Sequence, residues 1–177
     1  WVSYTLAKTE LKIDGINFQE NQETRKGKWY PARYDQRHNV KVASFYELSP
    51  RVSLSANFTY LTGTPTTFPT HRYEVQDLTI PENAEDSRNN LRIPDYHRLD
   101  FGITILGKAT NRRGEIRKNR DTYVITFYNL YARKNPFSIY FSQADERYGP
   151  GELAKTQASQ VSILGTIVPS FTYNFKF

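Results

Sequence analysis

The chain has 177 residues, a formal net charge of +6, 15% aromatic residues, and neither cysteine nor methionine. The missing cysteine excludes disulfides, thiolate metal sites and a Cys nucleophile. The richest apolar stretch, 161–168, is much shorter than the roughly 20 residues of a membrane-spanning helix. The aromatic content excludes a disordered chain. Because no methionine is present, we expect this to be a processed chain or a piece of a longer one.

Apolar residues recur at every second position, a spacing that predicts strands rather than helices. In chain order, strands are expected near 1–10, 36–47, 51–62, 96–108, 121–133 and 161–177. No amphipathic helix longer than a turn or two is expected. The segment 121–133 is apolar on both faces, so its pattern leaves the orientation of that strand open.

Long and short connections alternate between these strands. The long ones are 11–35, 63–95 and 134–160, and the shorter turns are 47–51 and 109–120. In an up-and-down antiparallel sheet every second connection lies at the same end, so all long loops should share one end. Strands of about ten residues, short periplasmic turns and long extracellular loops are typical of an outer-membrane β-barrel. The alternative is a soluble antiparallel sandwich with one face in its core.

Solvation energies assign the faces of such a barrel. A lipid-facing Lys or Arg at mid-bilayer costs about 2–4 kcal/mol, and Asp or Glu costs less. We therefore expect five polar side chains to face the lumen: Lys41, Asn57, Arg98, Asp100 and Asn174. The side chains expected to face lipid are Leu54, Phe58, Leu99, Phe101, Ile103, Phe171, Tyr173 and Phe175.

The end of the chain places an aromatic residue at every second position, namely Phe171, Tyr173, Phe175 and Phe177. This ending resembles the C-terminal insertion signal of outer-membrane proteins. Three further segments resemble, in order and spacing, the end of TonB-dependent receptors of Bacteroidota: GKWYPARYDQRH at 27–38, RIPDYHRLD at 92–100 and YNLYARKNPF at 128–137. The resemblance covers essentially all 177 residues.

The resemblance implies an all-β fold, an antiparallel transmembrane barrel of about 22 strands closed by an N-terminal plug. Six strands are fewer than the minimum of about eight that closes a membrane barrel. Residues 1–177 are therefore expected to be the C-terminal strands of a larger barrel and to form an open arc.

The implied function is import of a bulky nutrient (siderophore, oligosaccharide or peptide) across the bacterial outer membrane. The implied partners are the remainder of the same barrel and its plug, TonB acting through an N-terminal region outside these residues, and outer-membrane lipids. Some family members work with a surface lipoprotein that closes the barrel from the outside. Whether this chain has such a partner is left open. No cofactor and no catalytic role are expected. The alternative function is a structural barrel subunit or scaffold of an outer-membrane assembly without transport of its own.

Ligand contacts are expected from aromatic and arginine side chains in the first two long loops: Arg25, Trp29, Tyr30, Arg33, Phe68, Arg72 and Tyr73. The turn 109–120 holds five basic residues against one acidic residue. We interpret it as a solvated turn near anionic headgroups, not as a nucleic-acid site, because no RNA-binding motif accompanies it. His71 with Glu74 and Asp77 is a weak metal candidate, and Asp95 with His97 a weak hydrolytic pair.

Overall fold

The computed structural model describes residues 1–13, 29–75, 78–82, 88–110, 114–116, 121–143 and 156–175. Within these ranges the secondary structure is β-strand without any helix, and all strand pairs are antiparallel. The expected all-β antiparallel class is therefore confirmed. Helices long and apolar enough to span a membrane are absent from this part of the chain.

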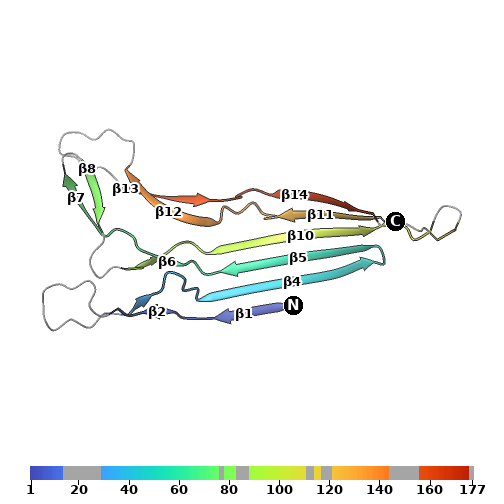
Figure 1. The fold of residues 1–177 in the computed structure, drawn as a ribbon, viewed down its shortest axis with the longest axis horizontal. Helices are drawn as coiled ribbons and strands as arrows, with labels where there is room; N and C mark the ends of the chain where they lie inside the picture. Colours follow the sequence, from blue (N-terminus) through green and yellow to red (C-terminus); the bar gives the residue numbers. More distant parts are fainter. Residues whose placement is uncertain are drawn as a thin grey trace.

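Six strands form one sheet: β1 (Val2–Leu6), β4 (His38–Ser49), β5 (Val52–Leu61), β10 (Tyr96–Leu106), β11 (Thr122–Tyr128) and β14 (Val168–Asn174). Their spatial order, β1-β4-β5-β10-β11-β14, follows the order of the chain. The sheet is thus an up-and-down meander, seen side by side in Figure 1. It is open, because β1 and β14 each pair on one side only within the described residues.

Four further strand pairs lie in the three long connections. They are β2 (Glu10–Leu11) with β3 (Tyr30–Pro31), β6 (Pro65–Thr66) with β9 (Leu91–Arg92), β7 (His71–Val75) with β8 (Leu78–Glu82), and β12 (Pro136–Gln143) with β13 (Thr156–Ser162). Figure 1 shows these pairs at the end of the sheet opposite the β4–β5 turn. We call that end of the sheet the rim.

The expected strand bounds need two corrections. The segment 161–177 is not one strand, because Val161 and Ser162 end β13 and β14 begins only at Val168. Leu164 has a positive φ of 53°, which interrupts the extended backbone between the two strands. The long connection 134–160 was expected to be a loop, but β12 and most of β13 occupy its two ends.

The register separates the side chains into two faces, because residues opposite each other in an antiparallel pair point to the same side. Across β4, β5 and β10, for example, Val42 lies opposite Phe58 and Phe58 opposite Leu99. We name the "apolar face" by its main members: Val2, Tyr4, Leu6, Val40, Val42, Tyr46, Val52, Leu54, Ala56, Phe58, Tyr60, Leu99, Phe101, Ile103, Ile105, Tyr123, Ile125, Phe127, Phe171 and Tyr173.

The register also resolves the strand whose orientation the sequence left open. Ile125 lies opposite both Ile103 and Phe171, so Tyr123, Ile125 and Phe127 belong to the apolar face. Val124 and Tyr128 belong to the opposite face, which we call the polar face.

Within the described residues neither face carries a second layer. The buried apolar side chains of this part of the chain are Ala32 and Pro65, and both lie in long connections instead of the six-stranded sheet. Large apolar side chains remain exposed on the apolar face, including Tyr4 (57%) and Phe171 (65%). The described part of the chain therefore does not form the packed core that a soluble sandwich requires.

Candidate functional site: the polar face and the rim

All five side chains predicted to face a lumen share the polar face. Lys41 and Arg98 flank Thr59 in one row, and Asn57 lies opposite Asp100 in the next. Asn174 lies opposite Thr122, further along the same face. The remaining members are mostly hydroxyl and amide side chains: Ser3, Thr5, Asn39, Ser53, Ser55, Thr59, Thr104, Thr122, Thr126, Ser170 and Thr172.

Arg98 is held in one place by groups from two strands. Its Nε donates to Asp100 Oδ2 (3.0 Å), and one Nη donates to the hydroxyls of Tyr96 (2.9 Å) and Tyr128 (2.5 Å). The guanidinium also lies 4.1 Å from the centre of the Tyr128 ring, within cation–π distance. Arg98 and Asp100 each keep a quarter of their side chain exposed. This cluster leaves a fixed, polar surface rather than a free cation.

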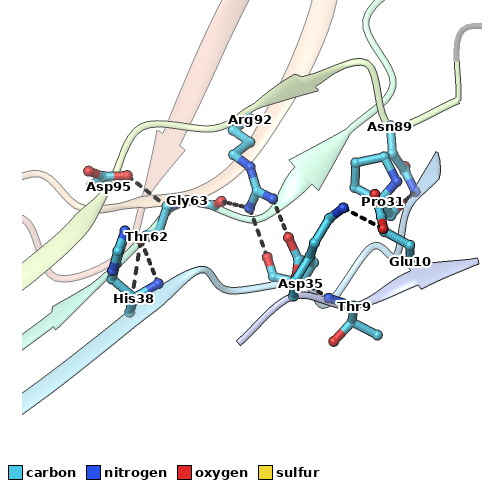
Figure 2. A network of polar contacts seen from close by, with 11 residues as sticks. Thr9, Glu10, Pro31, Asp35, His38, Thr62, Gly63, Asn89, Arg92 and Asp95 are labelled. Carbon is cyan, nitrogen blue, oxygen red and sulfur yellow. Dashed lines mark hydrogen bonds and ion pairs between the residues drawn. The ribbon is translucent and has the colours of Figure 1, made fainter. Parts of the chain in front are cut away.

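The rim holds a second set of polar contacts, centred on Asp35 (Figure 2). Asp35 is 1% exposed. Its Oδ1 accepts the N–H of Thr9 at 2.6 Å, and its Oδ2 pairs with an Nη of Arg92. The other Nη of Arg92 donates to the carbonyl oxygens of Asp35 and Gly63, both at 3.0 Å. Arg92 therefore joins the end of the first long connection to both ends of the second.

The charge of Asp35 is stabilised where it lies. Burial alone would raise its pKa, but hydrogen bonds from Arg92 and the Thr9 N–H, with the positive charges of Arg92 and Arg37, hold the pKa below its ordinary value. The carboxylate therefore stays ionised at neutral pH and pairs with Arg92.

Asp95 joins the two ends of the second long connection. The hydroxyl of Tyr60 donates to Oδ2 (2.6 Å) and the N–H of Gly63 donates to Oδ1 (2.9 Å). These two bonds lower the pKa of Asp95 despite its partial burial. Gly63 has no room for a side chain, because a Cβ would lie 1.7 Å from the carbonyl oxygen of Ile93.

Asn129 organises the third long connection. It is 1% exposed and has a positive φ of 55°, a conformation in which Asn is among the favoured residues. Its Nδ2 donates to the carbonyl oxygens of Arg133 (3.1 Å), Leu164 (3.2 Å) and Thr166 (3.4 Å), and its Oδ1 accepts the N–H of Arg133. One side chain thus ties the start of this connection to its end.

Further bonds make the contacts at the rim continuous. The N–H of Asn129 donates to Asp100 Oδ1 (2.9 Å), and Arg133 donates to the carbonyl of Asp95 (3.0 Å) and to Asn135 Oδ1 (3.2 Å). Asn135 in turn exchanges hydrogen bonds with the backbone of His97. We call this set the "rim network": Thr9, Asp35, Gly63, Arg92, Asp95, Asn129, Arg133 and Asn135.

The rim network explains what the three recognisable sequence segments have in common. Asp35 lies in 27–38, Arg92 and Asp95 in 92–100, and Asn129, Arg133 and Asn135 in 128–137. Sequence analysis singled out these segments but none of the bonds between them. Asp95 and His97 do not form a hydrolytic pair, because the His97 ring bonds the Tyr131 hydroxyl (2.7 Å) while Asp95 bonds Tyr60 and Gly63.

The predicted ligand-contact residues are spread over the rim end. Trp29 (67%), Arg33 and Tyr73 (46%) are exposed, whereas Tyr30 is half-buried in β3. Phe68 packs edge-to-face on Phe141 of β12, with ring centres 5.1 Å apart. Arg25 lies outside the described residues, and Arg72 is described only as part of β7.

Two contacts join the three long connections above the sheet. Asn89 Nδ2 donates to the carbonyl of Pro31 (2.7 Å), which links the second connection to the first. The Phe68–Phe141 contact links the second connection to the third. The exposed aromatic side chains therefore belong to one joined set of segments.

The terminal aromatic residues that the structure describes are in contact with one another or with Tyr123. Phe171 and Tyr173 lie on the apolar face beside Tyr123, and Tyr173 stacks on Phe175 with ring centres 5.8 Å apart. Phe177 lies outside the described residues, as do 111–113 and 117–120 of the basic turn and Asp77 of the weak metal candidate. Within the described ranges, no group of three or more acidic or histidine side chains could hold a metal ion.

Comparisons with known proteins were made by family, by sequence and by structure. No family model, curated protein or solved structure matches this chain.

We predict that Asp35→Asn destabilises the folded protein by about 2 kcal/mol, because it leaves the partly exposed Arg92 without its buried counter-charge. The matched control is Glu10→Gln in the Lys8–Glu10 ion pair, whose side chains are 54% and 31% exposed. Its cost should be roughly 0.5 kcal/mol or less, as for other surface pairs. Equilibrium unfolding in urea, on the full-length protein in detergent micelles, measures both. Equal costs would contradict a special role for Asp35.

The same variant has a pH dependence with a definite sign. The folded-state pKa of Asp35 is below its unfolded value of about 3.9, so its contribution is present above that pH and lost as the pH falls through the folded pKa. The stability difference between wild type and Asp35→Asn should therefore shrink on acidification. A difference that stays constant from pH 7 to pH 3 would argue against this ionised pair.

We predict that Asn129→Asp costs about 3 kcal/mol or more, because three carbonyl oxygens lose their donor and face a buried charge. Aspartate tolerates a positive φ as asparagine does, so the substitution does not change the conformational free energy of the backbone at this position. Asn90→Asp is the control: Asn90 is exposed, its hydrogen bonds within the described residues are with the backbone of Phe68, and the variant should lose about 1 kcal/mol or less. A similar loss for both variants, by urea unfolding, would refute the role given to Asn129.

Proposed function

We propose that this chain is part of the wall of an outer-membrane β-barrel receptor that imports a bulky nutrient with energy delivered through TonB. One observation carries the proposal: one face is predominantly apolar across all six strands of an open sheet, the opposite face is mostly polar, and no described element covers either face. A barrel wall has this arrangement because lipid meets one face and water the other.

The distribution of tyrosines on the apolar face supports a membrane position. Tyr4 and Tyr60 lie in one row near the rim, and Tyr123 and Tyr173 lie in a row near the other end. Eight residues separate these rows along β5 and β10, or about 27 Å of strand and about 20 Å of depth at a barrel tilt near 40°. Tyrosine and tryptophan gather at both membrane interfaces, and the apolar band of such barrels is about 25 Å tall.

The open edges support a larger barrel. In lipid, unpaired strand edges leave backbone groups without hydrogen bonds, so only closed barrels are stable there. On this proposal β1 and β14 pair with further strands of the same wall. The joined segments at the rim, with exposed Trp29 and Tyr73, are then the extracellular side where ligand is captured.

We predict opposite labelling of neighbouring cysteines introduced into β10 and β14. The 177 residues hold no cysteine of their own. In outer-membrane vesicles, Thr104→Cys and Thr172→Cys on the polar face should react with a small water-soluble maleimide. Ile103→Cys and Phe171→Cys on the apolar face should react at least tenfold more slowly and should recover after unfolding.

A second readout guards against local packing effects. A fluorophore attached at Ile103→Cys or Phe171→Cys should be quenched by spin-labelled lipid, and one at the neighbouring polar-face cysteine should not. Equal labelling and equal quenching within each pair would rule out a membrane wall.

Import has its own prediction. Cells that carry the full-length protein should accumulate one of three labelled probes (a ferric siderophore, an oligosaccharide or an oligopeptide) and should stop when a protonophore collapses the inner-membrane gradient. Trp29→Ala should lower that uptake severalfold. The control is Ile116→Ala, which removes a side chain that is more exposed (82%, against 67% for Trp29) from the connection at the other end of the sheet. If none of the probes requires both the protein and the gradient, the import proposal fails.

A further inference from the structure

Two Tyr–His pairs lie at the rim end of the apolar face. A face that contacted only acyl chains would have no use for these hydrogen-bonding side chains. The Tyr4 hydroxyl lies 2.9 Å from His38 Nδ1, and the Tyr131 hydroxyl lies 2.7 Å from His97 Nδ1. His38 lies opposite Leu6, and His97 lies opposite Tyr60, so both imidazoles belong to the apolar face. Each pair joins two different segments of the wall through the same two atoms, although the rings are stacked in the first pair and tilted in the second.

The hydrogen bonds define which ring nitrogen is left over. We assign the phenol O–H as the donor to Nδ1 in both pairs, because a phenol O–H donates readily, and this assignment places the ring proton on Nε2. Among the described residues neither Nε2 has a hydrogen-bond partner. Both histidines are half-buried. Two N–H donors therefore remain at the boundary between the apolar band and the rim.

The sheet fixes the distance between the two donors. His38 on β4 and His97 on β10 are separated by β5, so two strand spacings of about 4.8 Å lie between them across the sheet. His97 shares a row with Tyr60 and Val40, so His38 lies two positions further toward the rim. The neighbouring side chains on this face are Leu6, Val40, Tyr60 and Leu99. A small ligand in water would find little to bind there, whereas a lipid offers acyl chains to the apolar side chains and an acceptor oxygen at the same depth.

On the basis of the proposed function, we infer that the His38–Tyr4 and His97–Tyr131 pairs bind phosphate oxygens of outer-leaflet lipids through their Nε2–H groups. Each tyrosine is the positioning residue, because its hydroxyl bonds Nδ1 and leaves Nε2 as the ring nitrogen that remains for the lipid. The tyrosine rings lie at the depth where the acyl chains meet the headgroups, which is where tyrosines gather in membrane proteins. The wall would then carry two lipid sites at a fixed separation.

The test measures the proximity of ring nitrogen and lipid phosphorus. The full-length protein, labelled with ¹⁵N-histidine, is reconstituted in bilayers of phosphatidylglycerol and phosphatidylcholine and studied by ¹⁵N–³¹P rotational-echo double resonance. Signals of His38 and His97 are assigned from the single variants His38→Phe and His97→Phe. His71 is the internal control: its Nδ1 also bonds a hydroxyl, that of Thr70 at 3.0 Å, but it lies on β7 outside the sheet.

We expect the Nε2 signals of both His38 and His97 to be dephased by ³¹P severalfold more than that of His71. Tyr4→Phe should reduce the dephasing of His38 and leave that of His97 unchanged. If either wild-type signal is dephased no more than His71, the inference is wrong. That result would leave the wall proposal standing, because the cysteine labelling of β10 and β14 tests the wall without any histidine.

Discussion

A common register across six strands is the constraint on which this structure depends. Side chains alternate between faces with a period of two, so a slip of one residue in any strand would exchange its apolar and polar sets. The β4–β5 turn shows how the register is kept. A bulge between Glu47 and Ser49 shifts the phase by one residue, and Ser49 Oγ accepts the N–H groups of Arg51 and Val52. Tyr46 and Val52 consequently remain on the same face.

The register leads directly to the question of what covers the sheet. A single layer with two open faces buries almost no apolar surface, and isolated sheets of this kind depend on a second layer for stability. Here no described element covers either face. Under the proposed function lipid takes the place of the second layer on the apolar face, and the polar face needs no cover because its hydroxyl and amide groups bond water. The same reasoning gives the two Tyr–His pairs a place at the boundary between these environments.

Local patterns predicted the sheet well and the connections poorly. The strands at 51–62 and 96–108 were readable because alternation and composition agree there, and the observed strands are Val52–Leu61 and Tyr96–Leu106. The start of the last strand was misplaced, at 161 instead of Val168, because 161–168 is the richest apolar stretch of the chain. What breaks it is a tertiary contact: the side chain of Asn129 holds the carbonyls of Leu164 and Thr166. No pattern within 161–168 contains that information.

The rim network has the same character, since its partners are far apart in sequence. Asp35 and Arg92 are separated by 57 positions, and Asp95 and Arg133 by 38. Composition alone identifies these residues as polar loop residues. In the structure they hold together the ends of the three long connections. Most of these bonds use a side chain on one partner and backbone on the other, so they hold the chain path without depending on the residues further out. A few side chains therefore specify where each long connection begins and ends. The segments between these ends carry the exposed aromatic residues and can differ in sequence without disturbing the sheet. Under the proposed function, a wall built in this way can change what it captures and keep its register.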